Sequence, residues 1–369
     1  MGRNTYIFAG GGTGGHLYPA LAVAEELTHL DEEAMVIFAC SSRAVDRRIL
    51  DPLDYPICAQ PVRPLTKHPF RLLGFWGAWR KSITLGENLL RDLRPKAVLG
   101  LGGFAAGPVV RVAARRGIPT ALLNPDVVVG RANRYLSRRV DAVFTQFAST
   151  AGCFPSTVRD KIHTVGCPVR SQLLKPDREE GMRFFALDPA RKTLLVFGGS
   201  MLASSITDAI VALGGDLDKF ADDWQIILVA GPQKQTEVER TFASLAIRVV
   251  VLPYCERMDL GYAAADLVLC RGGAGTIAEL TATGTPAVVL PYPHHADRQQ
   301  YLNAAGLLEA AAAKIVEDRC DPLANAEALR AELLPILHDG ELLGAMRTAA
   351  RDFQPRHAAR EVAEWLSQR

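Results

Sequence analysis

The segment Gly10-Gly11-Gly12-Thr13-Gly14-Gly15-His16 decides how the first part of this chain folds. An apolar, strand-like stretch at 6–9 precedes it, and a helical pattern follows at 20–27. Strand, glycine-rich turn and helix open an α/β domain of the nucleotide-binding type. Glycines let the backbone approach a phosphate closely, and a helix N-terminus presents unpaired N–H groups. His16 adds an ionisable ring at the same place.

Length, composition, charge and cysteine content exclude several classes of protein. A length of 369 residues favours two domains, and a hydrophobic fraction of 49% is enough for full cores. The net charge of +2 gives no field that favours nucleic acid, so we expect no nucleic-acid partner. Seven cysteines without a CxxC pair indicate reduced thiols and a cytoplasmic protein. We also expect no signal peptide and no membrane-spanning helix.

Apolar runs alternate with helical patterns along the whole chain. The expected strands are 5–9, 35–39, 97–101, 120–123, 142–145 and 163–165, then 193–197, 225–230, 248–252, 267–270 and 287–290. Near-continuous apolar strands separated by helices predict parallel sheets that are buried on both faces. We expect a first domain over 1–168 and a second over 169–352. A last helix, within about 353–369, has no strand after it. It could pack on either the first domain or the second.

Each half carries its own glycine-rich turns after strands. The first half adds 102–108 to the opening turn, and the second half has 198–200 and 271–276. Ligands of doubly wound sheets bind at the carboxyl ends of the strands. Two such domains facing each other would form a cleft lined by glycine turns.

These motifs together resemble the MurG family, bacterial transferases that add N-acetylglucosamine to lipid I to make lipid II for peptidoglycan. The matching blocks are GGGTGGHLYPALAVAEEL at 10–27, LGLGGFAAGP at 99–108, GCPVR at 166–170, FGGS at 197–200 and the long block from YAAADLVLCRGGAG to QQYLNA at 262–304. The resemblance implies the GT-B architecture, with two Rossmann-like, doubly wound domains facing across a cleft. It also implies an inverting N-acetylglucosaminyltransferase that needs no cofactor, binds the acceptor mainly in the first domain and binds UDP-N-acetylglucosamine mainly in the second.

The sequence departs from the family pattern near the expected cleft. The His-Glu-Gln-Asn run of the family is Leu123-Asn124-Pro125-Asp126 here, and Phe104 replaces the usual tyrosine of the second glycine turn. A related glycolipid glycosyltransferase and a non-catalytic UDP-sugar-binding relative therefore stay as alternatives. A dinucleotide-dependent oxidoreductase is a third, because the first turn fits G-x-G-x-x-G and Asp31 lies about twenty residues further on.

The resemblance assigns a donor site. Glu279 matches the glutamate that accepts hydrogen bonds from the ribose, and Arg170 matches an arginine at the UDP site, where a fixed charge stabilises a departing diphosphate. Gln300 matches the residue that contacts N-acetylglucosamine. The expected donor residues are Thr13, Gly14, Gly15, Asp126, Arg170, Ser200, Cys255, Ala274, Gly275, Thr276, Glu279, Gln299, Gln300 and Asn303.

The acceptor is expected to meet the glycine turns of the first domain. An imidazole titrates near neutral pH, so His16 is the candidate general base, and Asp126 is its rival. The expected acceptor-pyrophosphate residues are Gly14, Gly15, Gly102, Gly103 and Phe104. We predict no metal site, and interpret the DxD sequence of Asp216 and Asp218 as part of a polar loop.

The segment from Tyr55 to Gly86 contains no acidic residue and carries both aromatic and basic side chains. Such a combination suits an anionic membrane surface, and the family contacts the membrane with this part of the first domain. The expected patch is Arg71, Leu72, Phe75, Trp76, Trp79, Arg80 and Lys81. We therefore expect a peripheral protein on the inner face of the cell membrane, and an ordinary packed helix is the alternative.

Overall fold

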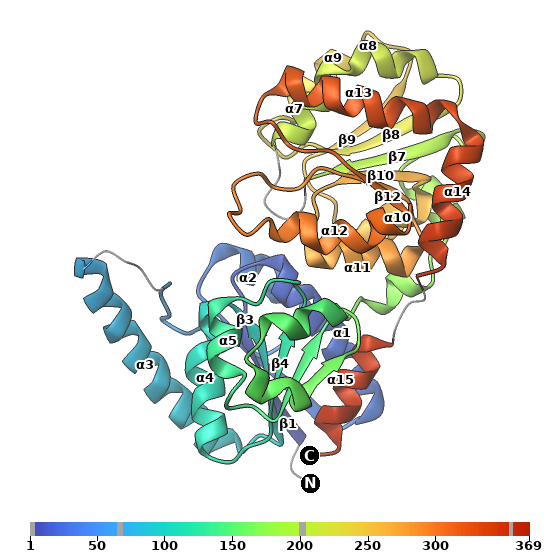
Figure 1. The fold of residues 1–369 in the computed structure, drawn as a ribbon. Helices are drawn as coiled ribbons and strands as arrows, with labels where there is room; N and C mark the ends of the chain where they lie inside the picture. Colours follow the sequence, from blue (N-terminus) through green and yellow to red (C-terminus); the bar gives the residue numbers. More distant parts are fainter. Residues whose placement is uncertain (1–3, 65–68, 199–203, 354–356) are drawn as a thin grey trace. The chain divides into compact units, whose positions relative to one another are not determined.

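Two parallel sheets, each with six strands in the described part of the chain, organise the computed structural model (Figure 1). It describes residues 4–64, 69–198, 204–353 and 357–369. The chain divides into unit 1, Met1–Arg170 with Arg356–Arg369, and unit 2, Ser171–Pro355. The expected α/β fold class, with two doubly wound parallel sheets, is confirmed.

Unit 1 has the strand order β2-β1-β3-β4-β5-β6. Its strands are β1 (Asn4–Gly10), β2 (Ala34–Ala39), β3 (Ala97–Gly102), β4 (Thr120–Asn124), β5 (Ala142–Thr145) and β6 (Ile162–Thr164). Its helices are α1 (Gly14–Leu30), α2 (Ala44–Leu50), η1 (Asp51–Leu53), α3 (Pro69–Leu93), α4 (Gly103–Arg115), α5 (Arg131–Leu136), η2 (Ala148–Cys153), η3 (Ser156–Lys161) and α15 (Ala358–Ser367).

Both faces of the unit 1 sheet are buried, as the continuous apolar strands predict. Because side chains alternate along a strand, Tyr6 and Phe8 of β1 join one core layer while Ile7 and Ala9 join the other. The first layer is closed by α1 and α15, and the second by α3 and α4. The last helix therefore belongs to unit 1, where Val362 is fully buried in the layer of α1 (Figure 1).

Unit 2 has the strand order β12-β11-β10-β7-β8-β9. Its strands are β7 (Lys192–Phe197), β8 (Trp224–Val229), β9 (Arg248–Leu252), β10 (Leu267–Cys270), β11 (Ala287–Val289) and β12 (Ala313–Ile315). Its helices are η4 (Ser171–Leu174), α6 (Arg178–Phe184), α7 (Ser204–Ala212), α8 (Gly214–Leu217), η5 (Asp218–Phe220), α9 (Gln235–Phe242), α10 (Met258–Ala264), α11 (Ala274–Thr283), α12 (Gln299–Glu309), α13 (Pro322–His338) and α14 (Gly340–Arg351).

Several strand bounds differ from the sequence predictions by a residue, and two segments differ in kind. The strand expected at 163–165 is β6, Ile162–Thr164, and the edge strand β12 was not predicted. It has only three residues, with Lys314 in the middle, so no apolar run marks it. The DxD segment is not a loop, because Asp216 lies in α8 and Asp218 begins η5.

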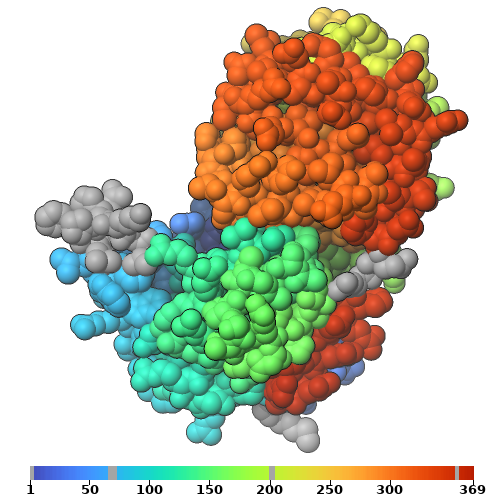
Figure 2. All heavy atoms as spheres, in the orientation of Figure 1, coloured from blue at the N-terminus to red at the C-terminus, as the bar shows by residue number. Residues whose placement is uncertain are grey.

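Helix α3 lies along the edge of unit 1 against α4, and its side chains form the light-blue margin of that unit in Figure 2. No helix in the described residues is both long enough and apolar enough to cross a membrane.

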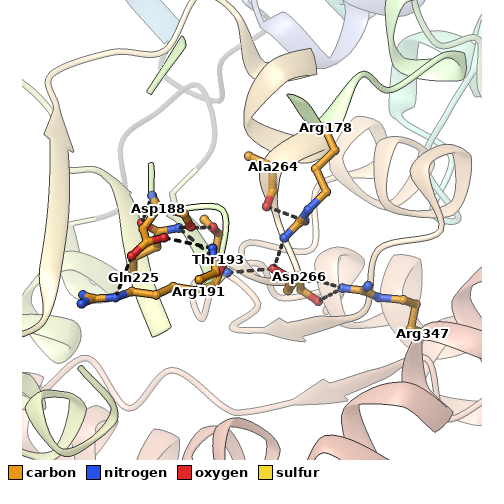
Figure 3. A network of polar contacts seen from close by, with 9 residues as sticks. Arg178, Asp188, Arg191, Thr193, Gln225, Ala264, Asp266 and Arg347 are labelled. Carbon is orange, nitrogen blue, oxygen red and sulfur yellow. Dashed lines mark hydrogen bonds and ion pairs between the residues drawn. The ribbon is translucent and has the colours of Figure 1, made fainter. Parts of the chain in front are cut away.

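A carboxylate at the amino end of the unit 2 sheet holds three elements together (Figure 3). Asp266, directly before β10, accepts hydrogen bonds from Arg178 of α6 at 2.9 Å and from Arg347 of α14 at 2.6 Å. It also accepts one from the backbone N–H of Thr193 at 2.8 Å. Its side chain is 8% exposed, and those of the two arginines are 44% and 32% exposed. Asp266 is therefore a structural clamp on the edge opposite the carboxyl ends of the strands.

We expect Asp266→Ala to lower the free energy of unfolding of unit 2 by about 2–3 kcal/mol. Breaking a buried ion pair costs about 3–5 kcal/mol, and the partial exposure of both arginines reduces that cost. Urea unfolding followed by circular dichroism measures the change. Asp222→Ala is the control, because Asp222 is exposed and should change stability by less than about 0.5 kcal/mol. Equal stability of the two variants would contradict the clamp.

Candidate functional site

The first glycine turn of unit 1 is held by a buried carboxylate. Asp46 of α2 accepts hydrogen bonds from the N–H of Gly12 at 2.6 Å and from the hydroxyl of Ser41 at 2.6 Å. Gly11 has a φ of +138°, and a Cβ there would lie 2.8 Å from Asp46 Oδ2, so only glycine fits. Sequence reasoning missed Asp46, because it lies in a segment with no glycine motif.

His16 lies in the first turn of α1 and faces the second glycine turn. Its Nδ1 is 3.1 Å from Thr13 Oγ1. A Cβ on Gly102 would come within 3.2 Å of its Nε2, so the imidazole packs directly on this glycine, which has a φ of +92°. The turns that end β1 and β3 thus meet around one imidazole, as the sequence predicts for neighbouring carboxyl ends.

Burial lowers the pKa of His16 below its ordinary value. The charge of Asp126, a hydrogen bond with the backbone of Gly11 and the charge of Asp46 act in the opposite direction, and burial outweighs them. A lowered pKa keeps the imidazole neutral near pH 7, which is the form that accepts a proton.

The replaced family motif lies at the end of β4, close to His16. The Nδ2 of Asn124 donates to the backbone carbonyl of Asp126 at 2.7 Å, and Asn133 of α5 donates to Asn124 Oδ1 at 3.0 Å. Asp126 is half-buried and acts electrostatically on His16. The structure therefore brings both predicted base candidates to one place.

The other predicted residues of unit 1 surround the same edge of the sheet. Thr13 and Gly15 are exposed, Gly14 begins α1, and Gly103 begins α4. Neither α1 nor α4 has an acidic residue in its first turn or a side-chain N-cap. No carboxylate of either helix therefore occupies the position at its N-terminus where an anionic ligand would bind.

Arg170 ends unit 1, and its guanidinium lies 4.9 Å from the centre of the Tyr18 ring. Its Nε is buried and has no hydrogen-bond partner among the described residues.

The spacing of Asp31 from the first glycine turn fits a dinucleotide-binding fingerprint, but its carboxylate makes a contact within the protein. Its Oδ2 accepts a hydrogen bond from Asn4 Nδ2 at 2.8 Å. This contact ties the end of α1 to the start of β1.

Unit 2 presents a matching helix start after β10. The helix α11 begins at Ala274 with Gly273 as its N-cap, no side-chain cap and no acid in its first turn. Ala274 is buried, and Gly275 and Thr276 are half-buried. By contrast, α6, α13 and α14 are each capped by an aspartate that bonds to backbone N–H groups. The start of α11 thus has the form of an anion site.

Two predicted amides bond to backbone groups of loops, Asn303 to the loop before α11 and Gln300 to the loop after β11. A Cβ on Gly272 would lie 2.1 Å from the backbone oxygen of Gln300, so α12 packs against this glycine without room for a side chain. Asn303 is 1% exposed and donates to the carbonyl of Gly272 at 3.1 Å. Gln300 Oε1 accepts from the N–H of Tyr292 at 2.8 Å. These contacts are structural, and sugar recognition by either amide stays a prediction.

Glu279 lies one turn into α11 beside a buried tyrosine. The hydroxyl of Tyr262, on α10, donates to Glu279 Oε2 at 3.0 Å. Tyr262 is 2% exposed and packs edge-on against Phe197, at 5.9 Å between ring centres. A rigid donor therefore fixes one oxygen of the carboxylate, while Glu279 itself is half-buried.

The remaining donor predictions fall in different surroundings. Cys255 is buried between β9 and α10, and Gln299 begins α12. Ser200 lies outside the described residues.

Sequence reasoning also missed a buried arginine that joins several strand ends of unit 2. Arg271, after β10, donates to the carbonyl of Leu290 at 2.8 Å, to Asp318 Oδ2 at 2.7 Å and to Ser205 Oγ at 2.7 Å. Burial alone would raise the pKa of Asp318, but hydrogen bonds, including those from Asn325 and Arg271, lower it. The loops after β10, β11 and β12 are thereby fixed to the start of α7. Nothing in the sequence pairs residues so far apart.

The DxD carboxylates are used in protein contacts. Asp216 bonds to Lys219 at 2.9 Å and to Arg330 at 2.8 Å, and these hydrogen bonds lower its pKa. Asp218 accepts from the N–H groups of Ala246 and Ile247. Within the described residues, no group of three or more His, Cys, Asp or Glu side chains is arranged to hold a metal ion.

Helix α3 carries the predicted membrane patch. Trp76 is 53% exposed, and Arg80 and Lys81 are exposed beside it. Trp79 packs on Gly107 of α4, since a Cβ on Gly107 would lie 2.8 Å from its ring, and Phe75 is half-buried. Arg71 and Leu72 lie where the structure does not describe side chains.

Known proteins match both units. Residues 6–145 match the glycosyltransferase family 28 N-terminal domain, and residues 193–362 match the C-terminal domain of the same family. The UDP-N-acetylglucosamine--N-acetylmuramyl-(pentapeptide) pyrophosphoryl-undecaprenol N-acetylglucosamine transferase of Thermodesulfovibrio yellowstonii is 32% identical over 359 residues, which cover 97% of this chain and 96% of that protein. The protein of the same name from Desulforudis audaxviator is 35% identical over 355 residues, covering 94% and 93%.

Solved structures agree with the sequence relatives. The crystal structure of Acinetobacter baumannii MurG superposes with a TM-score of 0.74 at 26% identity, covering 99% of this chain and 100% of that one. The resemblance seen in the motifs is thus confirmed over nearly the whole length. The chain belongs to the MurG family of N-acetylglucosamine transferases, within glycosyltransferase family 28.

Proposed function

We propose that this protein is an inverting glycosyltransferase. It moves N-acetylglucosamine from UDP-N-acetylglucosamine to the lipid-linked acceptor N-acetylmuramyl-(pentapeptide) pyrophosphoryl-undecaprenol. One observation carries the proposal: a chain related to these transferases over 97% of its length has an uncapped helix start in each unit, one beside His16 and one beside Glu279.

Unit 2 binds the donor in this proposal. The N-terminus of α11 holds the diphosphate, and Glu279 accepts hydrogen bonds from the ribose hydroxyls. Arg170 adds a positive charge for the departing diphosphate. Helix dipole and guanidinium thus supply electrostatic stabilisation of the leaving group.

Unit 1 binds the acceptor and starts the reaction. The neutral imidazole of His16 takes the proton from the attacking sugar hydroxyl. The hydroxyl oxygen then bonds to the anomeric carbon of N-acetylglucosamine from the face opposite the diphosphate. The bond from that carbon to the diphosphate oxygen breaks, and UDP leaves with the electron pair. Asp126 raises the proton affinity of the ring and is the competing candidate for the base.

Transfer of radiolabel from UDP-N-acetylglucosamine to a short-chain lipid I analogue tests the function. We expect a labelled disaccharide product with the β configuration, together with UDP. Product from a different lipid-linked acceptor alone would point to a related glycolipid transferase. Binding of UDP-N-acetylglucosamine without transfer to any acceptor would point to a non-catalytic relative.

We also propose that α3 docks unit 1 on an anionic membrane surface, so that the lipid-linked pyrophosphate reaches the glycine turns. Leu73 and Trp76 are one helical turn apart and are 74% and 53% exposed. Arg80 and Lys81 follow on the next turn and are exposed. Exposed apolar and basic side chains together suit the interface of an anionic bilayer.

The triple variant Trp76→Ser, Arg80→Glu, Lys81→Glu should lose most of its binding to vesicles that contain anionic lipid. Each basic residue near such a surface contributes about 1 kcal/mol, so two charge reversals and one lost aromatic ring should lower binding by at least about 100-fold. Vesicle co-sedimentation measures the loss.

The matched control reverses two exposed charges at the other end of the same helix, with Arg91→Glu in its last turn and Arg94→Glu directly after it. It should keep vesicle binding, and both variants should keep turnover on a soluble acceptor analogue. Equal loss of vesicle binding in both variants would mean that no local patch exists.

A further inference from the structure

Arg43 places a guanidinium group between the two glycine turns of unit 1. It is the residue before α2, directly after the loop that follows β2. Its Nη1 donates to the carbonyl of Gly12 at 3.4 Å, and its Cζ lies 4.8 Å from the centre of the Phe104 ring. One side chain thus touches the turn before α1 and the first turn of α4.

The charges around these turns do not favour an anion without Arg43. The N-termini of α1 and α4 each contribute about half a positive charge. The carboxylate of Asp46 lies directly beneath the first turn, 2.6 Å from the nitrogen of Gly12, and opposes them. Neither turn contains a lysine or an arginine. Both phosphates of a pyrophosphate are anionic, so a further cation is needed there.

Arg43 is a side chain that can supply this cation, because it touches both turns. It is exposed, and no ion pair joins it to a carboxylate among the described residues. Its contact with Gly12 uses a single donor of the five that a guanidinium carries. Stacking on Phe104 restrains the planar group without using its hydrogen-bond donors.

We propose that Arg43 binds the pyrophosphate group of the lipid-linked acceptor, with the Phe104 ring holding the guanidinium in place. This inference rests on the proposed function. It adds a substrate contact outside the glycine turns, directly before α2, and it assigns a role to the phenylalanine that stands where the family usually has tyrosine.

The test compares Arg43→Ala and Arg43→Lys with Arg48→Ala. Arg48 is an exposed arginine on α2, the helix that follows Arg43, and serves as the matched control. Initial rates with a short-chain prenyl-pyrophosphoryl-N-acetylmuramyl-pentapeptide give KM for the acceptor and, separately, for UDP-N-acetylglucosamine. We expect Arg43→Ala to raise the acceptor KM by at least about tenfold, since a hydrogen bond to a charged group is worth about that factor or more.

Three further results are expected to accompany this change. The donor KM should stay within about twofold of the wild type, because the donor binds elsewhere. Arg43→Lys should recover only part of the acceptor affinity. It restores the positive charge but lacks the planar guanidinium group that stacks on Phe104. Arg48→Ala should match the wild type.

Two results would overturn the inference. One is an acceptor KM that is the same in Arg43→Ala and Arg48→Ala. The other is a parallel rise of the donor and acceptor KM in Arg43→Ala, which would mean that the side chain only supports the fold of the turn.

A binding measurement separates this inference from the proposed function. Calorimetric titration with inorganic pyrophosphate, with UDP present in excess to fill the donor site, needs no turnover. If the wild type transfers no sugar but binds pyrophosphate at least about tenfold more tightly than Arg43→Ala, the proposed function fails and the anion site stands. Equal pyrophosphate binding by both proteins would remove Arg43 from the site, whatever the enzyme's activity.

Discussion

His16→Ala should lower kcat by about 100- to 10,000-fold, because positioned proton transfer contributes a factor of that size. The effect should fall mainly on kcat, since the glycine turns that bind the acceptor keep their backbone. Steady-state rates at saturating donor and acceptor measure it. His29→Ala is the control, because His29 is an exposed histidine at the far end of the same helix.

The pH dependence of kcat/KM gives an independent test of His16 as the general base. Because burial lowers the pKa of His16, kcat/KM should stay level down to about pH 6.5, the ordinary histidine value, and fall only below it. Asp126 raises the pKa of the ring, so Asp126→Asn should move the acid limb to still lower pH while keeping most of kcat. A larger loss of kcat in Asp126→Asn than in His16→Ala would make Asp126 the base.

The elements that could be predicted from sequence are those with a local signal. Apolar runs located all but one of the described strands, and the predicted glycine turns lie where α1, α4 and α11 begin. The edge strand β12 has three residues and a central lysine, so its pairing with β11 decides its structure. Tertiary context overrides local preference in such a strand.

The polar contacts that shape the sites carry no local signal. Asp46 meets Gly12 across 34 residues, and Arg271 meets Asp318 across 47. Each pair joins segments that follow different strands, so its partner depends on strand order rather than on spacing. The same holds for Arg43, whose contact with Gly12 spans 31 residues.

Amide side chains show a second limit of sequence reasoning. An asparagine or glutamine in a matching motif is compatible both with reading a sugar and with holding a loop. Here Asn303 is buried against Gly272, and Gln300 bonds to the backbone of Tyr292. Charged residues are less ambiguous, because burial of a charge needs a partner that the structure then reveals.

Glu279→Ala should raise the donor KM by about 100- to 10,000-fold. Two hydrogen bonds from ribose hydroxyls to a carboxylate are lost in the proposed complex, each worth about 1.5–3 kcal/mol. Tyr262→Phe keeps the carboxylate and the packing on Phe197 but removes the hydroxyl that fixes Glu279 Oε2. It should raise the donor KM by less than about tenfold, because the carboxylate remains and only its orientation is less firmly fixed, and it should leave kcat unchanged.

A donor that contains 2′-deoxyuridine separates ribose recognition from a general loss of structure. The wild type should discriminate strongly against this donor, Tyr262→Phe should discriminate less, and Glu279→Ala should hardly discriminate at all, because its carboxylate is gone. Glu309→Ala, an exposed glutamate at the end of α12, should behave as the wild type. If Glu279→Ala still distinguishes the two donors as strongly as the wild type, the ribose lies elsewhere and the tyrosine–glutamate pair only joins α10 to α11.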